Sequence, residues 1–297
     1  MRTILLAFAI CLSTTIPAVA QIPADKEVWV LLPLAKDAQK IVVEMNEYGE
    51  YVYQGDIIID ESQIITDISG KGRRKIDAML RAKRAQNRQQ VHYLSTRDEK
   101  VDLWANNTIP YVIDNDLSDN VKQLIADAAT SISTSTNLQL RPKENDDRHW
   151  VVFKPMLRKN TNVAGTSMLG RRLRPGGQYI RLRDDTVMIE GIIIHEVLHA
   201  AGFMHEHNRS DRDDYITIDY SNVKLGYRRE FRKEKESMNE TPYDFRSIMH
   251  YHRRAYGKIG PTGEPAITII TNPPGQRIGY QYLSAYDIQG INIVYPR

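Results

Sequence analysis

The stretch "IIHEVLHAAGFMHEHNRSDRDDY", Ile193 to Tyr215, decides the fold expected of this chain. Its apolar first part predicts a helix, in which residues four apart lie on one face about one turn from each other. His195 and His199 have this spacing, so their ring nitrogens can point at a single metal ion. The helix therefore predicts two ligands of one metal.

A third histidine, His205, follows a glycine at position 202. If the helix continued, His205 would lie about 240° around the axis from His199 and would face away from the ion, at about 100° per residue. Glycine lacks a Cβ and readily adopts a left-handed conformation that ends a helix. We therefore predict a positive φ at Gly202 and a turn that brings His205 back as the third ligand.

Glu196 follows the first ligand and lies one position round the helix, where it can reach a water on the metal without binding the metal. This is the position of a general base. Three protein ligands leave the fourth position of a zinc ion open for water, whose pKa zinc lowers to about 7. One Zn²⁺ per chain is expected. The alternative, core histidines without a metal, is disfavoured by the added glycine and third histidine.

The extended motif resembles the astacin family of zinc metalloendopeptidases, a branch of the metzincin clan, whose signature includes a downstream Met-turn. "SIMHY", Ser247 to Tyr251, is similar to that Met-turn. "LWANNTIPYVID" resembles the opening strand of the family and "LSAYDIQGINIVY" its closing helix. The resemblance covers about Ser95 to Arg297 and extends to the Glu and the Arg-x-Asp-Arg-Asp segment after the third histidine.

The resemblance implies a role for each of several residues. His195, His199 and His205 would bind zinc, Glu196 would be the base, and Met249 would form an apolar floor. Tyr251 would be a fifth, displaceable ligand whose hydroxyl stabilises the oxyanion; the alternative is a buried tyrosine with another partner. Glu206 would meet the buried N-terminus of the processed enzyme, and Arg209, Asp211, Arg212 and Asp213 would form a structural network. Surface or supporting roles are expected for His207, His250 and His252.

The expected fold class is α+β: a metzincin-like protease domain with a mixed sheet, an active-site helix and a Met-turn, preceded by a small propeptide. Helical spacing of apolar residues after Ser118 predicts one helix, and a Ser284 cap before a stripe ending at Pro296 predicts another. Strands are predicted at 28–34, 51–59, 108–114, 150–154 and 178–182, with a short helix between the first two.

The first residues have the pattern of a secretory signal. An apolar run from Ile4 to Leu12 precedes Ala18-Val19-Ala20, so residues 1–20 are expected to direct secretion, into the periplasm if the chain is bacterial. The only cysteine, Cys11, lies within this segment. No later segment has the ~20 apolar residues of a transmembrane helix. A net charge of +3 gives no basic field for nucleic acid.

Residues 21–94 are expected to form a propeptide, followed by the peptidase domain at 95–297. "YVYQGDI", Tyr51 to Ile57, resembles the aromatic-x-Gly-Asp motif of astacin propeptides, whose aspartate fills the open zinc position. Asp56 is therefore the expected ligand of the latent form, a polar turn residue being the alternative. The basic stretch Lys71 to Arg88 is a boundary, either a solvated helix face or linker or a region exposed to trypsin-like cleavage. An activating protease is expected to cut between Lys71 and about Ser95.

The favoured function is hydrolysis of protein or peptide substrates by a secreted zymogen. The alternative is a non-catalytic zinc-stabilised peptide-binding protein, which would need the histidines but no Glu196. An extended substrate is expected to pair with an edge strand, for which "QYIRL", Gln178 to Leu182, is the candidate. Arg253 and Arg254 are candidates for a pocket that favours acidic side chains. The physiological substrate and the oligomeric state do not follow from the sequence.

Overall fold

The computed structural model describes residues 26–30, 38–46, 48–60, 63–65, 103–157, 163–172, 174–185, 188–234 and 239–297. The predicted signal segment, the basic stretch 71–88 and the expected activation site lie outside these residues. Among the described residues, no helix is long and apolar enough to cross a bilayer.

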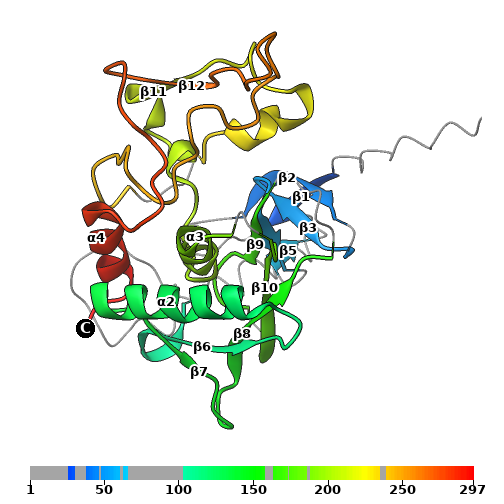
Figure 1. The fold of residues 1–297 in the computed structure, drawn as a ribbon, viewed down its shortest axis with the longest axis vertical. Coiled ribbons are helices and arrows are strands. Elements are labelled where there is room, and N and C mark those ends of the chain that lie inside the picture. The colour runs from blue at the N-terminus through cyan, green and yellow to red at the C-terminus, as the bar shows by residue number, and fades with distance from the viewer. Residues whose placement is uncertain are drawn as a thin grey trace, which may run out of the picture.

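In the described chain a mixed sheet of ten strands runs through the molecule. Figure 1 shows how its strands lie relative to the helices. The half of the sheet that is built by residues 108–182 contains β6 (Thr108–Ile113), β7 (Gln139–Pro142), β8 (His149–Pro155), β9 (Gly165–Met168) and β10 (Gly176–Leu182). β6 lies parallel to β7 and β8, and β10 lies parallel to β8. β9 is antiparallel to its neighbour in this half, β10. The predicted mixed sheet is confirmed.

The other half of the sheet is built by the segment before residue 66. It contains β1 (Lys26–Val30), β2 (Gln39–Met45), β3 (Tyr51–Tyr53), β4 (Ile57–Ile59) and β5 (Ile64–Ile65). β4 joins β9 in parallel, so one continuous sheet holds both parts of the chain. The helix predicted between the first two strands is wrong: β2 alternates buried and exposed side chains, because one face of it packs against β1 residues while the other meets solvent.

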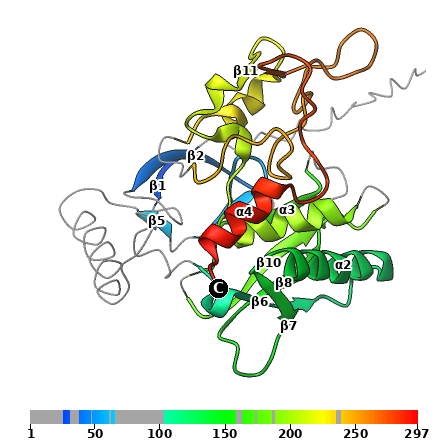
Figure 2. The same ribbon diagram turned by 90° about the vertical axis from the view of Figure 1, so that its left-hand side faces the viewer.

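Two helices pack together against the sheet (Figure 2). α2 (Asp119–Ser135) begins at Ser118, whose hydroxyl accepts a bond from the Val121 amide, and buries the predicted stripe. α3 (Glu190–Ala200) carries the first two histidines and is buried on almost all sides. α4 (Ala285–Val294) begins with a capping box between Ser284 and Asp287. All three helices contribute to one core, so packing fixes α3 rigidly.

The described residues between α3 and α4 form a lobe with little regular structure, in yellow and orange in Figure 1. It contains the antiparallel pair β11 (Ile216–Ile218) and β12 (Ile269–Thr271) and several 3-10 turns. These turns are η4 (Glu206–Asn208), η5 (Arg212–Asp214) and η6 (Leu225–Phe231); a further one, η3 (Ala105–Asn107), precedes β6. The lobe has its own aromatic-rich core around Phe231 and Tyr243.

Candidate metal centre

Three histidines converge at the end of α3. His195 and His199 lie one turn apart, with 3.1 Å between their Nε2 atoms. Gly202 has a φ of 100°, as predicted, and its amide bonds to the His199 carbonyl while the Phe203 amide bonds to the Leu198 carbonyl. The chain then turns back and places His205 Nε2 3.3 Å from His195 Nε2. The left-handed glycine therefore assembles the triad.

Backbone carbonyls fix the orientation of two of these rings. His195 Nδ1 lies 2.9 Å from the Ile248 carbonyl of the Met-turn, and His199 Nδ1 lies 2.8 Å from the Phe203 carbonyl. A carbonyl can only accept, so each Nδ1 carries the proton and each Nε2 presents a lone pair to the centre of the triad. The triad is thus arranged as a set of metal ligands and not of hydrogen-bond donors.

The geometry fits zinc. Two nitrogens each about 2.0–2.1 Å from a tetrahedral zinc ion are about 3.3–3.4 Å apart, which matches the separations in the triad. Asp56 supplies a fourth group, with carboxylate oxygens 3.3–3.7 Å from the three Nε2 atoms. All four ligand atoms lie within 4.8 Å of one another. Donor type, number and spacing are those of a closed four-ligand zinc site.

Asp56 is placed by the turn between β3 and β4. Burial raises the pKa of its carboxyl, whereas positive charge on the three histidines lowers it below its ordinary value. A metal cation held by the Nε2 atoms would lower this pKa in the same way. Within the described chain Asp56 Oδ1 is buried and has no hydrogen-bond partner. A buried carboxylate without such a partner is costly unless a cation lies beside it, which is what a metal in the triad would provide.

Glu196 lies beside the triad and is directed at the edge of β9. The side chain is 2% exposed, and its Oε2 has no partner among the described residues. Burial, with the nearby charge of Asp56, raises the pKa of its carboxyl. A Cβ at Gly165 would lie only 2.5 Å from Glu196 Oε1, so the absence of a side chain in β9 makes room for this carboxylate. No pattern in the sequence indicated that role for Gly165.

Tyr251 lies next to the triad with its hydroxyl turned toward the segment before residue 66. The hydroxyl donates to the Gln54 carbonyl at 2.9 Å, and the ring stacks on His207 with 3.9 Å between centroids. His207 is itself buried, with Nε2 near the Glu230 carbonyl. In this conformation the Tyr251 ring contacts the His205 ring, with 4.6 Å between centroids. Its role as a fifth, displaceable ligand stays a prediction.

The Met-turn is tied to both neighbouring segments. Met249 is buried in the main core, and its carbonyl accepts from the Glu206 amide. His250 lies buried between the Tyr243 hydroxyl and the Tyr251 carbonyl, whereas His252 is exposed. The expected supporting or surface roles of these histidines agree with their positions.

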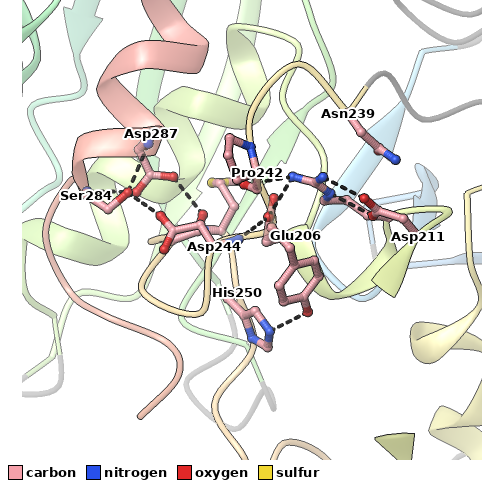
Figure 3. Close-up of polar contacts among 12 residues, drawn as sticks. Glu206, Asp211, Asn239, Pro242, Asp244, His250, Ser284 and Asp287 are labelled. Carbon is pink, nitrogen blue, oxygen red and sulfur yellow. Dashed lines mark hydrogen bonds and ion pairs between the residues drawn. The ribbon is translucent and has the colours of Figure 1, made fainter. Parts of the chain in front are cut away.

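Glu206 is at the centre of a polar network that includes Asp211, Asp244, Ser284 and Asp287 (Figure 3). Its Oε1 accepts from Arg209 Nη1 and from the Asp244 amide. Burial raises the pKa of its carboxyl to about 7, against the opposing charge of Arg209. Asp287 in turn accepts from the Ser247 hydroxyl and the Ile248 amide, so the start of α4 holds the Met-turn.

A buried carboxylate that the sequence did not reveal, Glu234, anchors the segment before residue 66. It accepts hydrogen bonds from the side chains of Tyr53, Gln54 and Gln39, the Gln54 bond measuring 2.7 Å. Arg229 forms a second anchor through an ion pair with Glu44. Nothing in the spacing of the sequence distinguishes Glu234 from the charges around it.

Two predictions about substrate binding, the strand that pairs with substrate and the pocket for acidic side chains, have different outcomes. "QYIRL" is not an edge strand, because β10 lies between β8 and β9. Within residues 108–182 the outer strands are β7 and β9, and β4 pairs with the outer side of β9. "QYIRL" mixes polar and apolar side chains, and such a pattern does not reveal whether a strand lies at the edge or inside a sheet. Arg253 is exposed and Arg254 donates to the Pro265 carbonyl, and the acidic preference stays a prediction.

Comparisons with known proteins agree with this geometry. The family model described as Astacin, a peptidase family, matches residues 96–296. The chain is 34% identical over 197 residues to the zinc metalloproteinase nas-14 of Caenorhabditis elegans, covering 65% of this chain and 37% of that protein. It is 36% identical over 191 residues to high choriolytic enzyme 1 of Oryzias latipes, covering 63% and 65%.

The solved structure of the Oryzias latipes enzyme, a hatching enzyme zinc-protease, has a TM-score of 0.58 at 30% identity. The match covers 69% of this chain and 98% of the solved chain. This chain spans about two fifths of the length of nas-14 and of its relative nas-13. The extent of the family match and the histidine triad together show that this chain belongs to the astacin family of peptidases, with a zinc-binding triad of His195, His199 and His205.

Proposed function

We propose that this chain is a zinc endopeptidase made as a latent precursor. The observation that carries the proposal is the position of Glu196, which lies between the zinc triad and the edge strand β9 with a carboxylate oxygen that has no partner in the described chain. A site that only binds zinc needs the three histidines but no such base. Proteins or peptides are the proposed substrates.

Each group at the site has a proposed role in hydrolysis. Zinc, when bound, polarises the peptide carbonyl and lowers the pKa of water. Glu196 would take a proton from that water and deliver it to the leaving amine. The Tyr251 hydroxyl, which donates to the Gln54 carbonyl here, would be free to donate to the oxyanion once that carbonyl has left. The β9 edge, occupied here by β4, would bind the substrate backbone.

Latency would follow from Asp56, which fills the fourth ligand position and displaces water. Activation would require a cut between Lys71 and about Ser95, followed by departure of the propeptide. The proposed layout is a signal at 1–20, a propeptide at 21–94 and a peptidase domain at 95–297; the family match over 96–296 supports the last boundary. Secretion and an activating protease are part of the same proposal.

The test compares three purified full chains before and after limited trypsin treatment, with trypsin then blocked. Processed wild type should contain one zinc per chain and hydrolyse a denatured protein in a chelator-sensitive manner. Processed Glu196→Ala should keep its zinc and lose activity by a factor of about 10²–10⁴, the usual contribution of a general base. Equal activity in this variant would favour the non-catalytic binding protein instead.

The same experiment tests latency. Intact wild type should be inactive, whereas intact Asp56→Ala should hydrolyse the substrate without processing, because water regains the fourth ligand position. An Asp56→Ala precursor as silent as wild type would remove Asp56 from the latency mechanism without affecting the assignment of Glu196.

A further inference from the structure

Glu230, at the end of η6, is a buried acid that the proposed chemistry does not use. The residue is 1% exposed. Its Oε1 accepts from Arg229 Nε at 2.9 Å, but its Oε2 is buried and no donor among the described residues reaches it. A buried carboxylate oxygen without a partner is unfavourable, so such an atom indicates a site for a donor that arrives from outside.

The free oxygen faces the residue next to the zinc ligand of the propeptide. That residue is Gly55, and a Cβ built on it would lie 3.6 Å from Glu230 Oε2, 3.5 Å from the Tyr251 hydroxyl and 2.6 Å from the Tyr256 hydroxyl. Gly55 presents no side chain to the recess formed by Glu230, Tyr251 and Tyr256, in which the Tyr256 hydroxyl leaves no room for a Cβ. A substrate side chain at the same place would have to displace the Tyr256 hydroxyl, and it would then lie beside the Glu230 carboxylate.

The walls of the recess are aromatic. Tyr256 stacks on Tyr227 with 4.5 Å between centroids, and it meets Phe231 edge to face. A cavity of about 160 Å³ adjoins this point, with Gly55, Tyr227 and Tyr256 in its lining. Aromatic faces pack against the aliphatic stems of lysine and arginine and attract their charged heads.

The charge of the recess changes when the propeptide leaves. Burial raises the pKa of Glu230 to about 7; Arg229 opposes this, and the carboxylates of Glu44 and Asp56 add to it. Both of these carboxylates belong to the segment that would depart. The processed enzyme therefore keeps the ionised form of Glu230 more readily than the precursor does.

We propose that Glu230 determines specificity by receiving the side chain of a lysine or arginine adjacent to the scissile bond of the substrate. This proposal rests on the proposed endopeptidase function. The cation would donate to Oε2 while its stem packs against the tyrosine rings, and Arg229 would continue to hold Oε1. Glu230 would act on substrate choice and take no part in proton transfer.

The test uses matched peptides that differ at one residue beside the cleaved bond, with lysine, arginine, glutamine or norleucine at that place. The full chain is processed with trypsin, trypsin is blocked with a serine-protease inhibitor, and only the chelator-sensitive rate is counted. Wild type should cleave the basic peptides with a kcat/KM about tenfold or more above the norleucine peptide. Glu230→Gln should bring this ratio close to one, and Glu264→Gln, a change at an exposed glutamate, should leave it unaltered.

A second measurement does not depend on cleavage of basic peptides. Agmatine, a small guanidinium compound, should inhibit hydrolysis of the norleucine peptide competitively in wild type and about tenfold more weakly in Glu230→Gln, with zinc content and melting temperature reported for both. Equal ratios of basic-peptide to norleucine-peptide kcat/KM in wild type and Glu230→Gln would overturn the proposal. A wild-type preference for glutamine over lysine would also overturn it. That preference is expected if Arg229, released from Glu44, bonds to both carboxylate oxygens of Glu230. Chelator-resistant or absent hydrolysis of every peptide would instead refute the endopeptidase function.

Discussion

Gly202 shows how a single residue sets the metal centre. Its φ of 100° is costly for any residue with a Cβ, yet a Cβ there would meet only Leu103, at 3.9 Å. The cost of Gly202→Ala is therefore backbone strain and not a clash, about 1–2 kcal/mol. We expect this variant to fold, to lose that much free energy of unfolding and to bind zinc about tenfold more weakly, as measured by competition with a chelator.

Gly226→Ala is the matched control, since a Cβ there meets nothing within 4 Å and its φ is not left-handed. Zinc affinity of Gly202→Ala equal to that of the control would show that His205 reaches the site without the left-handed turn.

At Gly165 the situation is the opposite: its φ is not left-handed, but there is no room for a Cβ. A Cβ there would lie 2.5–2.7 Å from three atoms of Glu196. Gly165→Ala should therefore displace the base while leaving the histidines in place, so that the processed enzyme keeps its zinc but loses kcat by tenfold or more. Zinc analysis beside steady-state kinetics separates the two effects. Unchanged kcat would mean that Glu196 moves aside at no cost to catalysis.

These residues also mark what sequence can predict about the site. The triad lies within eleven residues, so local helix geometry and one glycine were enough to predict it. The contacts of Gly165, Glu230 and Glu234 join segments that are far apart in the chain. Gly165 of β9 meets α3, whereas Glu230 of η6 and Glu234 shortly after it meet the segment before residue 66. No spacing within the sequence encodes such contacts.

At the scale of elements, the pairing of β4 with β9 covers the strand edge that is proposed to bind substrate. The two strands pair in parallel through bonds from the Ser167 amide to the Asp56 carbonyl and from the Leu169 amide to the Ile58 carbonyl. β9 is only four residues long and contains no strong strand formers beyond one threonine, which is why the sequence favoured β10 as the edge. The turn that carries Asp56 is thus held by strand pairing on one side and by side chains on the other.

Among the side chains that hold the turn with Asp56, Glu234 accepts three of the hydrogen bonds. Glu234→Ala would leave Tyr53, Gln54 and Gln39 without their buried acceptor, at a cost of about 1–3 kcal/mol in propeptide docking. We expect the intact precursor of this variant to show higher basal hydrolysis and faster amide exchange over 51–59, measured by mass spectrometry.

The processed form of the same variant is the internal comparison. Once the propeptide has left, Glu234 has lost all three partners, so the substitution should change processed activity little. Loss of processed activity as large as the effect on the precursor would show that Glu234 supports the catalytic domain itself and not the docking of the propeptide.

At the scale of the whole molecule, the first segment is not an independent domain. Its apolar cluster, which includes Val30, Val43 and Ile57, is completed by Leu169 and Met204, which come much later in the chain. Its sheet is completed by β9, and a separate β4 would present an unpaired edge. A small segment that borrows both core and sheet from a neighbour has little to stabilise it alone.

We therefore expect an isolated peptide of residues 21–94 to lack stable structure in water. Its far-ultraviolet circular dichroism should show no cooperative thermal transition. Mixed with the processed zinc enzyme, the peptide should gain strand signal and inhibit hydrolysis, because β9 and the triad supply the missing partners. The Asp56→Ala peptide should inhibit at least tenfold more weakly, since it docks without binding zinc. A cooperative transition in the free peptide would show instead that the propeptide folds first and docks as a preformed unit.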